Sequence, residues 1–219
     1  MRPVLCLITD RRRFGPAWQQ PLVEQVGAAA GAGIDLVQVR EPDLAGAALL
    51  SLVRDCLDAV GGTRTRVVVN DRLDVAMAAG AHGVHLRADS MPAEHVRRVT
   101  GRPFLVGRSV HAVDEATAVS ESGAVDYLLF GTVFESASKP GRAPAGLTEL
   151  ERVAQAVRIP VLGVGGVNLE RLAAVGRTGA AGWAGIGLFA DTPAEELSEI
   201  VRESTAAFDT PVTPPLTCR

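Results

Sequence analysis

The chain has few cysteines, and their spacing in the sequence indicates no disulfide bond between them. Its 219 residues include only three, at positions 6, 56 and 218, which are widely separated and form no metal-binding or redox motif. This spacing excludes a disulfide framework. We expect Cys6 and Cys56 to lie buried as small apolar residues.

The chain also lacks an excess of positive charge and a long apolar run. A net charge of −3 and a pI of about 5.8 provide no overall positive field for nucleic acid or an anionic membrane. The apolar run near the N-terminus is too short for a signal peptide or a membrane span, so we expect a cytoplasmic location. The expected partners are small molecules or, in a homo-oligomer, further copies of the chain. The basic run at residues 11–13 predicts a solvated turn.

What the sequence has instead is a repeated phrase in which a helix-like stretch ends at glycine and a short apolar run follows. The phrase occurs at Gly33, Gly80, Gly123 and Gly179. Glycine suits the left-handed position just past a helix, and the apolar run suits a strand that is buried on both faces. Each phrase therefore predicts a junction between a helix and a strand.

Further strand-like runs lie between these junctions, at residues 67–70, 104–107 and 160–165, and another lies at residues 4–9. Eight strands that alternate with helices predict a single (β/α)8 TIM barrel, with an open doubly wound sheet as the alternative. We expect the barrel to occupy residues 1–207, with its last helix ending near Ala207. A mobile, proline-rich tail is expected at residues 208–219.

In such a barrel the reactive groups lie where the strands end and in the loops that follow. The glycines after the seventh and eighth predicted strands, Gly165, Gly166 and Gly187, would let backbone N–H groups approach a phosphate. Tight turns also use glycine, so the placement of these residues, rather than the motif, favours a phosphate site. Lys139, beside two serines, could close over a phosphate or carboxylate, or could lie solvated in its loop.

Three further strand-end residues suggest chemistry. Arg40 ends an apolar strand, where its charge needs an anion, either a ligand or a carboxylate such as Glu41 or Asp71. His111 could transfer a proton near neutral pH, although a structural or helix-capping role is the alternative. Asp71 could hold Mg²⁺ with Asp89 nearby, or could instead cap the helix that follows it.

Several blocks of sequence, in order along the chain, resemble the superfamily of thiamine phosphate synthase and the TenI-like thiazole tautomerase. The resemblance covers about residues 3–200. The matching blocks are residues 38–41 (QVRE), 69–72 (VNDR), 83–86 (GVHL), 107–111 (GRSVH), 129–136 (LFGTVFES) with Lys139, and 159–166 (IPVLGVGG).

The sequence departs from the synthase pattern where that enzyme handles a diphosphate and its metal. Pro42 stands in place of a lysine, Ser90 in place of a metal-binding aspartate, and Arg87 and Ala88 in place of a Gly-Gln pair. These departures favour the tautomerase, which the resemblance implies would aromatise a carboxythiazole phosphate tautomer without a cofactor. In that reaction His111 would take a proton from ring C2 and return one at the exocyclic carbon.

Two alternatives remain open. The first is a synthase that couples hydroxymethylpyrimidine diphosphate to thiazole phosphate with Mg²⁺, for which Asp71 would be a metal ligand. The second is a non-catalytic regulatory barrel that binds a thiamine precursor.

The resemblance also implies a set of binding residues. The thiazole phosphate would be held by Ser136, Ser138, Gly165, Gly166, Ile186 and Gly187. The carboxylate, or the second substrate of a synthase, would meet Gln38, Arg40, Asn70, Ser109 and Lys139. Gly187 replaces the serine of both subfamilies, so one hydroxyl donor to the phosphate is missing.

Overall fold

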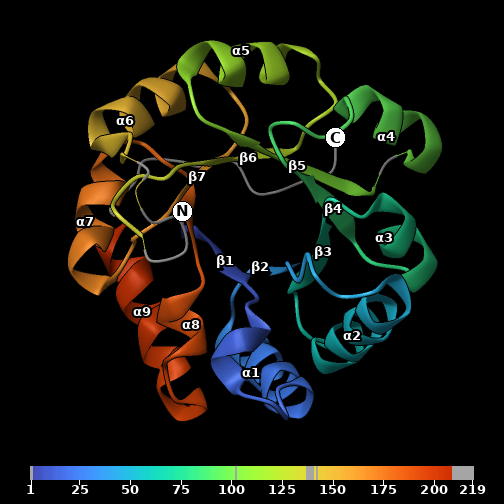
Figure 1. The fold of residues 1–219 in the computed structure, drawn as a ribbon. Coiled ribbons are helices and arrows are strands. Elements are labelled where there is room, and N and C mark those ends of the chain that lie inside the picture. The colour runs from blue at the N-terminus through green and yellow to red at the C-terminus, as the bar shows by residue number, and fades with distance from the viewer. Residues whose placement is uncertain (1, 102, 137–140, 142, 209–219) are drawn as a thin grey trace.

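The structure is a computed structural model that describes residues 2–101, 103–136, 141 and 143–208. Figure 1 shows a central ring of strands surrounded by helices. The strands are β1 (Val4–Ile8), β2 (Leu36–Val39), β3 (Arg66–Asn70), β4 (Gly83–Leu86), β5 (Leu105–Val110), β6 (Tyr127–Phe130), β7 (Val161–Val164) and β8 (Gly182–Gly185). All neighbouring pairs are parallel, and β1 pairs with both β2 and β8, so the sheet is closed. The predicted (β/α)8 barrel is confirmed, and the open sheet is excluded.

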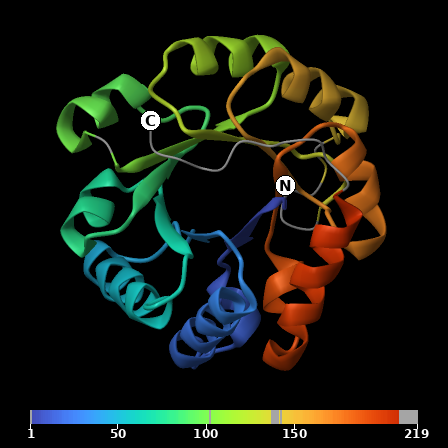
Figure 2. The ribbon, with the colours of Figure 1, turned by 180° about the vertical axis from the view of Figure 1, so that it is seen from behind.

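The helices form the outer layer, which surrounds the barrel in both opposite views (Figures 1 and 2). The α-helices are α1 (Gln19–Ala32), α2 (Gly46–Ala59), α3 (Leu73–Ala79), α4 (Ala93–Thr100), α5 (Val113–Glu121), α6 (Gly146–Ala156), α7 (Leu169–Arg177), α8 (Gly187–Ala190) and α9 (Leu197–Ala207), with 3-10 turns η1 (Arg11–Phe14) and η2 (Ala194–Glu196). The four glycines of the repeated phrase all have positive φ, as predicted. None of the helices in the described ranges is long and apolar enough to cross a membrane.

Two hydrophobic clusters follow from the alternation of side chains along each strand. On β1, Cys6 and Ile8 belong to the cluster inside the barrel, whereas Leu5 and Leu7 belong to the cluster between barrel and helices. Cys6 and Cys56 are both fully buried, as predicted. Burial raises the pKa of Cys56 to about 12, which keeps its thiol protonated and inert.

The C-terminal helix α9 ends at Ala207, where the sequence predicts its end. Phe208 follows it and is buried. Its Cα and ring lie close enough to Gly176 that a Cβ on that glycine would be 3.3 and 3.4 Å from them. The rest of the predicted mobile tail lies outside the described residues.

The prediction of a solvated turn at residues 11–13 is confirmed for Arg12 and Arg13, which are exposed, but is wrong for Arg11. These residues form η1, and Arg11 pairs with Glu41 at 3.2 Å and with Asp43 at 2.6 Å. Glu41 is only 4% exposed, and burial raises its pKa while the contacts from Thr9 and Arg11 oppose that rise. The buried carboxylate requires a cation, and this requirement fixes the conformation of the basic run.

Candidate active site

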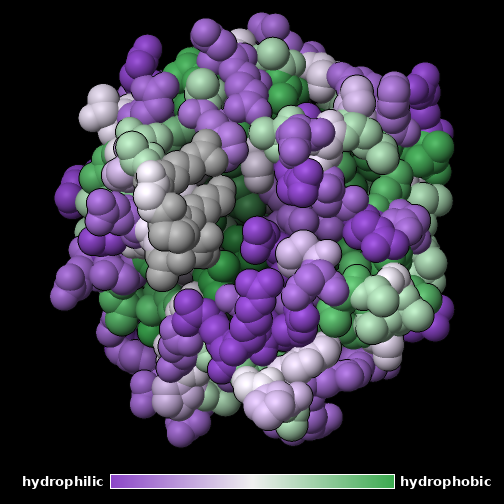
Figure 3. Space-filling view, viewed as in Figure 1, coloured by the Kyte–Doolittle hydropathy of each residue, from purple (hydrophilic) through white to green (hydrophobic). Residues whose placement is uncertain are grey.

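Two adjoining cavities lie where the strands end. The larger cavity, of about 390 Å³, is lined mainly by residues at or just after the ends of β2 to β5, and the smaller glycine cavity, of about 210 Å³, mainly by residues at or just after the ends of β6 to β8. Val164 and Ile186 line both and form the boundary between them. The face seen in Figure 3 is hollowed near its centre, with hydrophilic residues along much of the rim.

The structure brings together most of the binding residues that the sequence predicts. The larger cavity is lined by Gln38, Arg40, Asn70, Ser109 and His111, and the glycine cavity by Ser136, Gly165, Gly166, Ile186 and Gly187. Ser138 and Lys139, predicted for the same site, lie outside the described residues.

Two glycines of the loop after β7 are required by close contacts in the glycine cavity. Gly165 has φ 98°, and a Cβ there would lie 2.6 Å from Thr132 Cγ2. Gly166 has φ 63°, and its Cβ would lie 2.3 Å from the carbonyl oxygen of Glu135. Any larger residue would strain the backbone and push the loop after β6 away, so the cavity keeps its shape only with glycine at both positions.

Arg13 is a cation of the glycine cavity that sequence reasoning missed. It lines the cavity, pairs with Asp191 and lies 3.8 Å from Asp10. A Cβ on Gly187 would lie 3.1 Å from the Asp191 carboxylate and 3.5 Å from Arg13 Nη1. Arg13 therefore lies beside Gly187, where its guanidinium can donate to a phosphate as the absent serine hydroxyl would.

In the larger cavity, Gln38 offers a buried acceptor. Its side chain is 2% exposed, and Nε2 donates to Asn70 Oδ1 at 2.9 Å. Within the described part of the chain, its Oε1 is buried and has no hydrogen-bond partner. Buried polar atoms are nearly always satisfied, so this oxygen is suited to accept an N–H from a ligand.

Arg40 directly follows the apolar strand β2 but is not buried. Its residue is exposed on the rim of the larger cavity. Neither candidate carboxylate pairs with it, because Glu41 contacts Arg11 and Asp71 contacts Arg87. Arg40 therefore faces a cavity with its charge available to a ligand anion.

His111 is held in one tautomer. Its Nδ1 lies 2.5 Å from the carbonyl oxygen of Gly131, so Nδ1 carries the proton and donates it there. Its backbone N–H donates to Glu115 Oε2 at 2.7 Å, which fixes the start of α5. In this tautomer the lone pair resides on Nε2, where it can accept a proton.

A buried hydrogen-bonded chain behind Ser109 was also missed by sequence reasoning. His85 Nδ1 lies 3.1 Å from the hydroxyl of Tyr127, and Nε2 lies 2.9 Å from Ser109 Oγ. Burial lowers the pKa of His85 to about 3, so the ring is neutral and links the two hydroxyls. The arrangement depends on Gly107, which pairs with both His85 and Tyr127, because a Cβ there would lie 2.2 Å from Tyr127 Cζ.

Asp71 neither caps a helix nor presents free oxygens. The N-cap of α3 is Arg72, without a side-chain cap, so the capping prediction is wrong. Asp71 Oδ1 accepts from Ser90 Oγ, and Oδ2 lies 3.5 Å from Arg87 Nε. Arg87 also binds both oxygens of Asp89, at 2.9 and 3.0 Å.

These contacts bear on the Mg²⁺ that a synthase would use. A magnesium ion needs carboxylate oxygens at about 2.1 Å. The oxygens of Asp71 and Asp89 instead contact the guanidinium of Arg87 or the hydroxyl of Ser90. No group of three or more metal-binding side chains occurs in the ranges that the structure covers. This donor set does not fit a divalent cation.

A closed (β/α)8 barrel with glycine-rich loops after β7 and β8 facing a cavity is typical of enzymes that act on phosphorylated small molecules. A family model described as thiamine monophosphate synthase matches residues 5–189. The chain belongs to the thiamine monophosphate synthase family of thiamine biosynthesis enzymes.

Individual relatives agree with this assignment. The chain is 38% identical over 196 residues to the thiamine-phosphate synthase of Roseiflexus castenholzii, covering 89% of this chain and 84% of that protein. It is 43% identical over 160 residues to that of Anaeromyxobacter dehalogenans, covering 73% and 71%. The thiamine phosphate pyrophosphorylase structure from Pyrococcus furiosus superposes with a TM-score of 0.78 at 30% identity, over 92% of this chain and 96% of that one. These names favour the coupling alternative over the isomerisation that the sequence analysis preferred.

Proposed function

We propose that the protein couples hydroxymethylpyrimidine diphosphate to thiazole phosphate and forms thiamine phosphate. The observation that carries this proposal is the pair of adjoining cavities, each with its own cationic side chains. Arg13 borders the glycine cavity, and Arg40 and Arg87 border the larger one. Two anionic substrates can therefore bind side by side, in contact across Val164 and Ile186.

The residues supply binding and orientation. The glycine cavity holds the thiazole phosphate, and the larger cavity holds the pyrimidine and its diphosphate. The thiazole nitrogen forms a bond to the exocyclic methylene carbon of the pyrimidine. The bond from that carbon to the diphosphate oxygen breaks, and its electron pair leaves with pyrophosphate. Positioning of the two reactants accounts for much of the rate enhancement in such a reaction.

The larger cavity could bind the pyrimidine through polar side chains that line it. Gln38 Oε1 is suited to accept from an amino group of the ring. Ser109 is oriented by His85, so its hydroxyl has a fixed direction. These contacts would turn the methylene carbon of the substrate toward the boundary with the glycine cavity.

One observation favours a second candidate, the thiazole tautomerase. His111 lines the larger cavity, and in the tautomer that donates from Nδ1 to Gly131 its lone pair lies on Nε2. Such a base could move a proton between C2 and the exocyclic carbon of a carboxythiazole phosphate. In this case His111→Asn would abolish isomerisation, whereas full turnover by that variant would exclude His111 as the base.

Two incubations separate the candidates. The purified protein is given both coupling substrates, with and without Mg²⁺, and separately the carboxythiazole phosphate tautomer. Products are measured by liquid chromatography and mass spectrometry. Thiamine phosphate and pyrophosphate in equal amounts support the proposal. Isomerisation alone would replace it with the tautomerase, and binding of thiazole phosphate without either reaction would favour the regulatory alternative.

A further inference from the structure

The loop after β4 shows how the larger cavity is built without a metal site. In this loop, residues 87–91, Arg87 places its guanidinium between the two nearest carboxylates, Asp71 and Asp89. Arg87 is about half exposed and lines the larger cavity together with Asp89. The position that a divalent cation would require is thus taken by a side chain that is itself a cation.

The loop is held in this conformation by several contacts. Ser90 Oγ accepts from the backbone N–H of Arg87 at 2.9 Å and donates to Asp71. From β5, Arg108 donates to the carbonyl oxygens of Ala88 at 2.7 Å and Met91 at 2.8 Å. The arrangement is therefore an ordered network rather than a metal site that has lost one ligand.

The guanidinium retains capacity to bind an anion. Nε and Nη2 of Arg87 donate to the carboxylate of Asp89. No hydrogen bond from Arg87 Nη1 is found in the described part of the chain. A guanidinium has five N–H donors in a planar fork that matches phosphate oxygens. Arg40 adds a second guanidinium on the rim of the same cavity.

We propose that Arg87 and Arg40 bind the diphosphate in the larger cavity in place of a divalent cation, so that anion binding there does not depend on Mg²⁺. This inference rests on the proposed coupling function and assigns the group that stabilises its leaving pyrophosphate. When the carbon–oxygen bond breaks, the electron pair remains on a pyrophosphate oxygen, to which the two guanidiniums can donate hydrogen bonds.

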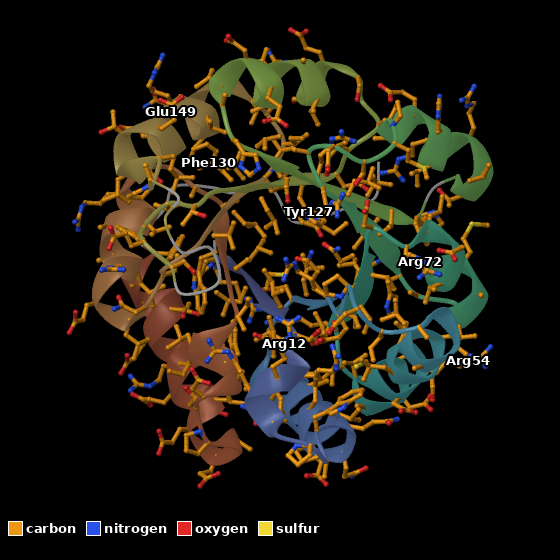
Figure 4. The ribbon with its side chains drawn as sticks, in the orientation of Figure 1. Arg12, Arg54, Arg72, Tyr127, Phe130 and Glu149 are labelled. Atoms are coloured by element: carbon orange, nitrogen blue, oxygen red, sulfur yellow. The ribbon has the colours of Figure 1, made fainter. Side chains whose placement is uncertain are left out.

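The test is isothermal titration of the full chain with inorganic pyrophosphate, once in EDTA and once in excess MgCl₂. We expect the two dissociation constants to agree within about threefold, and Arg87→Gln to weaken binding in EDTA by about tenfold or more. The matched control is Arg72→Gln. Arg72 forms an equivalent pair with Asp74 and, in Figure 4, lies toward the outside of the barrel. This control should bind like the wild type.

A second variant removes the guanidinium of Arg87 and adds a carboxylate that a divalent cation could use. Replacing Arg87 by glycine and Ser90 by aspartate (R87G with S90D) frees Asp71 and adds a carboxylate. We expect this double variant to lose pyrophosphate binding in EDTA and to regain it with Mg²⁺. The inference is overturned if the wild type binds pyrophosphate only with Mg²⁺, or if a folded Arg87→Gln variant binds as the wild type does. Cation-independent binding without thiamine phosphate formation would leave the anion site standing and refute the coupling function.

Discussion

His85 makes the stability of the barrel depend on pH. Its ring is fully buried between Tyr127 and Ser109, and burial, with the nearby charges of Arg108 and Arg40, lowers its pKa to about 3. In the unfolded chain the same group has a pKa of about 6.5. The folded state therefore excludes a proton that the unfolded state binds, so stability falls as pH drops below about 6.5.

The magnitude follows from the two pKa values. Each pH unit below 6.5 favours the unfolded state by about 1.4 kcal/mol until the folded pKa is reached. Between pH 7 and pH 5 the loss from this group is about 2 kcal/mol. Urea unfolding of the wild type and of His85→Gln is measured at both pH values. The difference between the two proteins isolates the contribution of His85, because the other titrating groups affect both proteins. The glutamine variant should lose about 2 kcal/mol less than the wild type.

The matched control is His95→Asn, on the exposed side of α4. It should keep the pH dependence of the wild type. The reasoning is refuted if the wild type and His85→Gln lose the same free energy of unfolding between pH 7 and pH 5.

Three further predictions follow from the site. Arg13→Gln should weaken the binding of thiazole phosphate by about tenfold in isothermal titration, with Arg12→Gln as the control; equal affinities would remove Arg13 from the phosphate site. Gly107→Ala should lower the free energy of unfolding by about 1–3 kcal/mol in urea because its Cβ meets the Tyr127 ring. The open position Gly31 in α1 should tolerate alanine. Gly166→Ala should reduce thiazole phosphate affinity, and an unchanged titration would contradict the close contact with Glu135.

The fold could be predicted from the sequence because its signals are local. Left-handed glycines end helices, and fully buried parallel strands are continuous apolar runs, so the order of elements determines the barrel. The predicted phosphate glycines, Gly165, Gly166 and Gly187, were found together for the same reason. A barrel brings the ends of its strands to one face whatever the detailed packing.

The errors and omissions concern contacts between residues distant in sequence. Arg11 was expected in solvent because nothing local shows that Glu41, thirty residues later, is buried. His85 was not singled out because its partners lie on two other strands. A glycine at position 107 opposite a lone tyrosine was the signal available, but its meaning depends on strand register.

Arg87 shows the limit of a family pattern. The sequence indicates that the metal-binding residues have changed, but not what replaces them. Only the structure places the guanidinium between Asp71 and Asp89, with Ser90 on the first of these carboxylates. Such contacts decide whether a metal site with changed residues has lost its anion-binding role or keeps it through another side chain.

The most direct test of two anion sites that meet at Val164 and Ile186 is a crystal structure with thiazole phosphate and pyrophosphate bound, grown in EDTA. The account predicts the thiazole phosphate against Gly165 and Gly166, and pyrophosphate against Arg40 and Arg87. Both anions in one cavity, or a larger cavity that stays empty of pyrophosphate, would contradict it.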